Sequence, residues 1–206
     1  MIGRRLLLFA VAVLVFHHVP SFAGDTAGDW IDLLTPFAVV GAAAWFLWGV
    51  RAPGAALVLA FVAGVLYVDG HGIHLAANSI GHESPTGDVE RVTHFWDEEW
   101  GHFEWHLGLF GLFAALALAA GSAHVSRRMG ALVAVLLGFT LFTSTIEGGT
   151  WWLELLAAAV LVPWALRARW PVLVSCAGAF ALAAVMIGIW AAWHGGMPQF
   201  SDVGWL

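Results

Sequence analysis

Two stretches of the sequence carry histidine and carboxylate side chains at helical spacing. His71 and His74 lie three residues apart, and His102 and His106 lie four apart, so each pair occupies one face of a helix. Glu99 and His102 form a Glu-x-x-His pair, a spacing with which helical bundles hold metal ions. These residues predict a transition-metal site whose ligands are His71, His74, His102, His106 and Glu99.

Three further acids could serve the chemistry of such a site. Glu147 and Glu98 are candidate ligands or proton carriers. Asp69 could orient an imidazole by a hydrogen bond to the ring nitrogen that does not bind the metal. The chain has one cysteine, Cys176, so no Cys-x-x-Cys motif exists. A metal ion would therefore be held by imidazole and carboxylate. Zinc is the first expectation, with iron or copper as alternatives.

The composition predicts that lipid surrounds these residues. Hydrophobic residues make up 61% of the chain and charged residues 11%, and a soluble domain carries about twice that charged fraction. We therefore expect residues 1–206 to form one transmembrane domain. The eight basic residues are all arginines and are scattered along the chain, which argues against nucleic acid as a partner.

About 20 apolar residues are needed for one helix to cross a bilayer. The fold class predicted from such stretches is an all-α, polytopic transmembrane bundle of seven helices. The expected helices cover residues 4–22, 33–50, 54–77, 98–121, 129–146, 151–167 and 171–193.

The arginines predict the orientation of the bundle. Seven of them fall at helix ends that alternate onto one side, which the positive-inside rule makes cytoplasmic. These are Arg4, Arg5, Arg51, Arg127, Arg128, Arg167 and Arg169. The expected topology is N-in and C-out, in a bacterial-type inner or plasma membrane, with the site facing the extracytoplasmic side.

The first segment has a second interpretation. Arg4-Arg5, the apolar run that follows and the small residues before Gly24 also fit a cleavable signal peptide. Residues 1–23 are thus either the first helix or a signal peptide, and in the latter case six helices remain. The orientation of the rest is the same in both cases.

The candidate residues are predicted to lie at similar depths in the membrane. At about 1.5 Å per residue, His74 lies about 30 Å beyond Gly54, and His102 lies about 30 Å before Ser122. Glu147 lies about 27 Å beyond Met129. Ionisable groups inside a membrane normally pair or line a cavity. The alternative is a hydrogen-bonded network that only joins helices.

Other polar residues are expected outside the site. The histidines predicted to lie among lipid headgroups are His17, His18, His82 and His194. The acids predicted to belong to a solvated loop are Glu83, Asp88, Glu90 and Asp97. Gly70 and Gly72 flank His71, so the third helix is expected to loosen there.

Seven helices with clustered metal ligands resemble the intramembrane hydrolases related to alkaline ceramidases and adiponectin receptors. That family carries a His-x-x-x-His pair on its last helix, whereas the last helix here offers only His194. Histidine-box hydroxylases and desaturases are similar in histidine content, but their boxes lie on the cytosolic side. No residue role is carried over from either group.

The function predicted from these residues is that of a metal-dependent membrane enzyme, first a zinc-type hydrolase of a lipid or other amphipathic substrate. A dinuclear iron or copper oxidoreductase is one alternative. A metal-ion or proton transporter, or a haem-binding or assembly subunit, is another. The expected partners are the bilayer and the amphipathic substrate, and oligomerisation is left open.

Overall fold

The computed structural model describes residues 1–23, 25–81, 83 and 85–205. Its described part is helical, and seven helical stretches are long and apolar enough to cross a membrane, which confirms the predicted all-α bundle of seven helices. The elements are α1 (Ile2–Phe22), α2 (Asp25–Asp32), α3 (Thr35–Val50), α4 (Gly54–Gly81), α5 (Asp88–His94), η1 (Phe95–Gly101), α6 (His102–Ala120), α7 (Arg127–Glu147), α8 (Trp151–Ala168), α9 (Pro171–His194) and η2 (Ser201–Val203).

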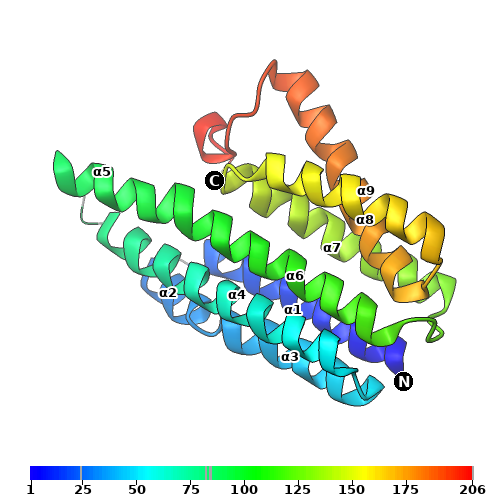
Figure 1. Cartoon of the computed structure of the whole chain (residues 1–206). Helices are drawn as coiled ribbons and strands as arrows, with labels where there is room; N and C mark the ends of the chain where they lie inside the picture. The colour runs from blue at the N-terminus through cyan, green and yellow to red at the C-terminus, as the bar shows by residue number, and fades with distance from the viewer. Residues whose placement is uncertain (24, 82, 84, 206) are drawn as a thin grey trace.

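The long helices run antiparallel along the bundle (Figure 1). The N-terminus and the turns α3–α4, α6–α7 and α8–α9 lie at one end, and the C-terminus and α5 lie toward the other. The seven arginines used to predict the topology fall at the end with the N-terminus. The opposite end carries the histidine-rich and acidic stretches, so the bundle has two chemically different ends.

The fourth spanning segment is longer than predicted. It was expected to begin at residue 98, but α5, η1 and α6 form one continuous helical stretch from Asp88 to Ala120. Its first turn carries Asp88 and Glu90, and the last turn of α5 carries Arg91 and His94. The two acids at the N-terminus complement the helix dipole and stabilise a helix that projects beyond the apolar part of the bundle.

Helices α4 and α6 form the most extensive helix pair, and two glycines allow their close approach. A Cβ atom at Gly70 would overlap the backbone nitrogen of Trp105, and one at Gly108 would overlap that of Tyr67. Small residues at such crossings let helix backbones pack against each other in membranes. The prediction that α4 loosens at Gly70 is wrong, because α4 runs unbroken through it.

The core joins helices from distant parts of the chain. The rings of Phe9 on α1, Phe113 on α6 and Phe180 on α9 pack edge to face, with Phe113 5.5 Å from Phe9 and 5.6 Å from Phe180 between ring centroids. All three side chains are buried. Helix α1 is therefore an integral part of the packed bundle.

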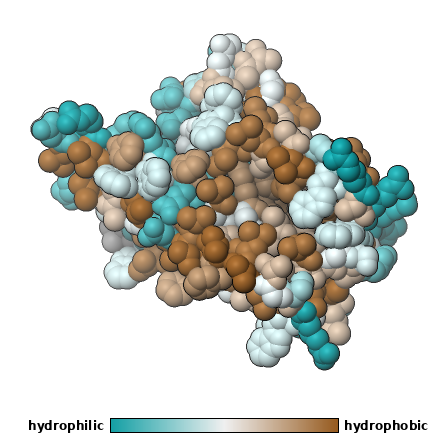
Figure 2. All heavy atoms as spheres, in the orientation of Figure 1, coloured by the Kyte–Doolittle hydropathy of each residue, from teal (hydrophilic) through white to brown (hydrophobic). Residues whose placement is uncertain are grey.

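The outer surface suits a lipid environment. Hydrophobic residues spread over the middle of one face, and hydrophilic residues gather toward the ends (Figure 2). Large apolar side chains such as Phe37, Phe61, Trp48 and Trp193 are more than 70% exposed. A soluble monomer rarely exposes apolar patches of this extent, so we assign the protein to the membrane.

Candidate metal centre

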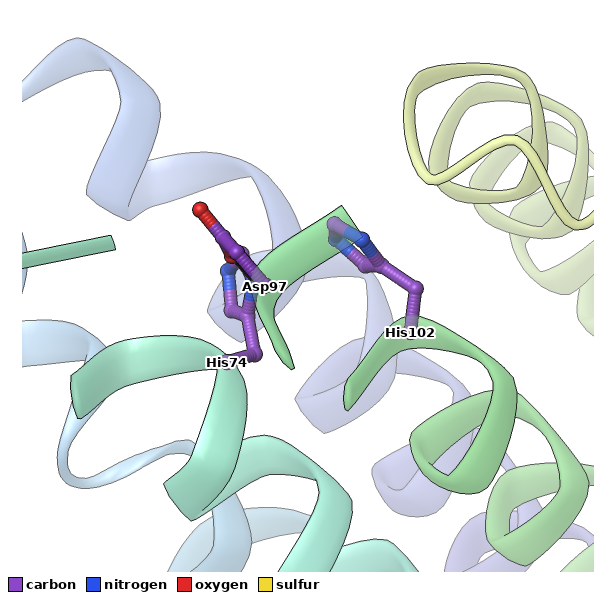
Figure 3. A group of neighbouring side chains, drawn as sticks. All are labelled: His74, Asp97 and His102. Carbon is purple, nitrogen blue, oxygen red and sulfur yellow. Dashed lines mark ion pairs between the residues drawn. The ribbon is translucent and has the colours of Figure 1, made fainter. Parts of the chain in front are cut away.

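Three side chains from neighbouring helical segments meet near the histidine-rich end of the bundle. His74 comes from α4, Asp97 from η1 and His102 from the first position of α6 (Figure 3). One nitrogen or oxygen atom from each lies within 4.8 Å of the other two. All three residues are largely buried, and their atoms are of the kind that bind transition metals.

One polar atom of each residue in this group makes no hydrogen bond in the described part of the chain. Nδ1 of His74 lies 2.6 Å from Oδ1 of Asp97, but the two are not aligned for a hydrogen bond. Nδ1 of His102 is also buried without a hydrogen-bond partner. Leaving buried polar atoms unpaired is costly. A bound cation would satisfy all three atoms at once.

The π-helical segment η1 explains how Asp97 joins the group. Asp97 and His102 are five residues apart, which in an α-helix places them about 140° apart around the axis. A π-helix pairs residue i with residue i+5 and so brings the two onto one side. Asp97 is 8% exposed, so its prediction as a solvated loop residue is wrong. The α-helical period, applied to the sequence alone, places Asp97 and His102 on different sides of the helix and so does not predict that they meet.

A third glycine brings η1 against α4 at the site itself. A Cβ atom at Gly101 would lie 3.0 Å from the backbone nitrogen of His74 and 2.7 Å from the backbone oxygen of Trp96. Any larger residue would push the two segments apart. The approach of α4 to η1, and with it the distance from His74 to Asp97, therefore depends on Gly101.

The other two predicted histidine ligands are engaged elsewhere. Nε2 of His71 lies 2.9 Å from the backbone oxygen of Asp32 and 3.4 Å from its carboxylate, which ties α4 to α2. Nδ1 of His106 lies 2.7 Å from the hydroxyl of Thr150 at the start of α8. Both histidines are buried, and neither belongs to the group of three. These contacts join helices, while the second ring nitrogen of each histidine makes no hydrogen bond among the described residues.

The predicted carboxylates fall into two sets. Glu98 lies beside the group, with Oε2 3.7 Å from Nδ1 of His102. Glu147 lies nearby, where Oε2 accepts hydrogen bonds from the backbone N–H groups of Phe200 and Ser201. Glu99 and Asp69 have exposed side chains outside the group, and Asp69 faces an apolar groove along α4. Of these acids, only Glu98 contacts a member of the group.

Trp105 stands at the centre of the histidines. The ring centroids of five histidines lie between 4.8 and 5.7 Å from the Trp105 ring, namely His17, His71, His74, His102 and His106. Trp105 is 7% exposed, and its Nε1–H finds no acceptor among the described residues. A rigid indole in this place limits how the imidazoles can turn. Trp105 therefore acts as the spacer around which they are arranged.

A cavity of about 630 Å³ opens beside the group. Its lining includes His74 and His102 of the group, together with Glu98, Trp105 and Glu147. His17 and His18, predicted among the headgroups, line it as well, whereas His194 does not and His82 lies outside the described residues. A drug-sized ligand fits a cavity of this volume. The group of three thus has a chamber in which a reactant could meet it.

The bundle and the site together define a membrane-type helical protein with a His-Asp-His group that could hold a metal ion. Comparison with protein-family models, with curated proteins and with solved structures gave no match. The function is therefore inferred from the geometry of the site.

Proposed function

We propose that the protein is a metal-dependent membrane enzyme in which His74, Asp97 and His102 bind one transition-metal ion. The observation that carries this proposal is the meeting of three largely buried ligand residues beside a cavity, with one ligand atom of each within 4.8 Å of the other two. Three protein ligands leave a coordination position open, which is the arrangement of catalytic rather than structural zinc sites. Zinc is accordingly the first choice of metal.

Hydrolysis is the reaction that this arrangement favours. A zinc ion lowers the pKa of a bound water so that hydroxide is available near neutral pH. Glu98 is the acid nearest to the ligands, 3.7 Å from His102, and it lines the cavity, so it is placed to accept the proton of that water. Glu147 is held by the backbone of Phe200 and Ser201 and shapes the cavity wall instead.

Transport is less well supported by the polar residues between the site and the other end of the bundle. The hydroxyls of Thr140 and Ser175 bond to the carbonyls of Leu136 and Pro171, four residues earlier in their own helices. Neither hydroxyl bonds to another helix in the described part of the chain, so these two do not form a relay between helices. The cavity therefore suits an enzyme reaction better than the passage of an ion across the membrane.

The proposal is tested by metal content. Protein purified in an uncharged detergent is loaded with zinc, desalted and analysed by mass spectrometry, beside the His74→Ala/His102→Ala double variant. His124→Ala is the matched control, because His124 is exposed and lies at the opposite end of the bundle. About one zinc per chain, lost only in the double variant, supports the proposal. Equal zinc in all three proteins would overturn it.

A second candidate function is oxidation by iron. Two histidines and one carboxylate with open positions also form the ligand set of non-haem iron oxygenases. Anaerobic loading with Fe²⁺ and the visible spectrum after exposure to nitric oxide distinguish the two metals. Tight, stoichiometric Fe²⁺ that zinc cannot displace would favour oxidation over hydrolysis.

A further inference from the structure

The cavity beside the proposed metal site is strongly acidic. Four carboxylates line it, and no arginine does so in the described part of the chain. They are Asp29, Asp32, Glu98 and Glu147. Arg91, the arginine nearest in sequence to the site, is 75% exposed and pairs with Asp88 on α5. A divalent ion at the proposed site would offset only part of this negative charge.

The same cavity has an apolar end. Along α7 its wall runs from Glu147 back through Ser144, Thr143 and Phe142 to Phe139. Eight residues of helix separate Glu147 from Phe139, which is about 12 Å along the axis. Glu147 and Phe139 therefore give this wall a carboxylate and an aromatic ring separated by the length of a short alkyl chain. Such an arrangement matches a molecule with a polar head and an apolar tail.

Helices α1 and α7 are in contact at the Phe139 end of the cavity. His18 on α1 stacks on Phe139 at 5.2 Å and bonds to the Thr143 hydroxyl at 2.9 Å, so these side chains form the seam between the helices. Phe139 lines the cavity and is also 43% exposed. Phe139 thus belongs both to the cavity wall and to the exposed surface of α7, where an alkyl tail in the surrounding lipid would meet it.

Two buried groups point to a ligand within the cavity. His102 and Trp105 line it and are each 7% exposed, and Nδ1 of His102 and Nε1 of Trp105 have no partner among the described residues. The Nδ1 atom is assigned to the metal in the proposed function. The Nε1–H of Trp105 remains as a donor for a substrate's carbonyl or hydroxyl oxygen.

We propose that the cavity binds amphiphiles with a cationic, ammonium-type headgroup, with the headgroup beside Asp29, Glu98 and Glu147 and the tail along Phe139 and Phe142. This substrate class deepens the proposed enzyme function and rests on it for its catalytic meaning. The four cavity carboxylates also disfavour an anionic headgroup, such as a fatty-acid carboxylate or a phosphate, because it would meet like charge.

The test uses eight-carbon ligands that differ in the headgroup. Octylamine, octanoate and octanol are titrated against the full chain in an uncharged detergent, and binding is measured by calorimetry against protein-free detergent. Octylamine should bind about tenfold tighter than octanoate, and added salt should weaken it. Ethylamine, which has the charge without the tail, should bind at least about tenfold more weakly than octylamine.

A matched pair of variants locates the effect in the cavity. Asp29→Asn removes a cavity carboxylate outside the metal group and should weaken octylamine several-fold. Asp88→Asn removes a carboxylate that is 88% exposed on α5 and should change nothing. Octanoate binding as tightly as octylamine, ethylamine matching octylamine, or equal effects of the two variants would each overturn the inference.

Zinc content tests the enzyme proposal, and selectivity for octylamine tests the substrate class, so the two can fail separately. The titrations are repeated on zinc-loaded and on chelator-treated protein, with zinc content measured in the same samples. Selectivity for octylamine in both samples supports the acidic cavity whatever the metal content. Stoichiometric zinc without selectivity for octylamine would leave the metal site standing and overturn the substrate class.

Discussion

Oδ1 of Asp97 lies 2.6 Å from Nδ1 of His74, across the contact between η1 and α4. The aspartate supplies the negative charge of the proposed metal site, and the histidine supplies a neutral donor from another helix. Replacing Asp97 by asparagine therefore removes the negative charge of the proposed site and keeps the shape of the side chain.

Asp97→Asn should keep the fold and lower zinc affinity at least about tenfold, because the amide is a weaker ligand and carries no charge. Competition with a chelator of known affinity measures the change. Asp88→Asn serves as the control on an exposed turn of the neighbouring helix α5. Unchanged zinc affinity in Asp97→Asn would remove Asp97 from the ligand set.

His71→Ala and His106→Ala test which histidines are ligands. Their ring nitrogens bond to Asp32 and Thr150, so we expect each variant to retain zinc and to lose stability, by about 1–3 kcal/mol. Zinc content and unfolding in denaturant measure the two effects separately. Loss of zinc from either folded variant would extend the ligand set toward the one predicted from the sequence.

Gly70→Ala should destabilise the protein, because the new methyl group would overlap the backbone of Trp105. Overpacking of this kind costs about 1–3 kcal/mol. Gly72→Ala lies two residues along the same helix with no atom within 4 Å of the added carbon, and should be neutral or stabilising. Thermal unfolding of both variants checks the comparison, and similar midpoints would show that the α4–α6 approach tolerates a side chain.

The mature protein is expected to retain α1. Leu6, Phe9, Ala10 and Val13 are fully buried in the bundle, and His17 and His18 line the cavity. Removing this helix would expose the core that it covers. The intact mass of the purified protein decides the question, and a mass that lacks residues 1–23 would favour the signal-peptide interpretation.

The N-in, C-out topology predicts which loops face outward. Cys176 is 1% exposed and so contributes little background when cysteines are introduced for labelling. Thr86→Cys should react with an impermeant maleimide on intact cells, and Ser122→Cys should react only after permeabilisation. The reverse pattern would invert the topology and place the site on the cytoplasmic side.

Apolar length was enough to predict the seven spanning helices, because each must cover the same thickness of lipid. Matching depths on α4 and α6 also brought His74 and His102 into one predicted set, and the structure places their rings 4.4 Å apart. The sequence did not predict Asp97, because its pairing with His102 needs the π-helical turn. Nor did it indicate that His71 faces Asp32, since α2 lies in a stretch too short and polar to be recognised as a span.

The π-helical turn also makes the site sensitive to chain length. Each turn of η1 holds about one residue more than an α-helical turn, so removing Phe95 or Trp96 would allow an ordinary α-helix to form while Asp97 and His102 stay five residues apart. An α-helix places such a pair about 140° apart around the axis, which carries Asp97 away from His102. The ligand set is thus encoded in the count of residues as much as in their identity, and a deletion that leaves every ligand in the sequence could still abolish it.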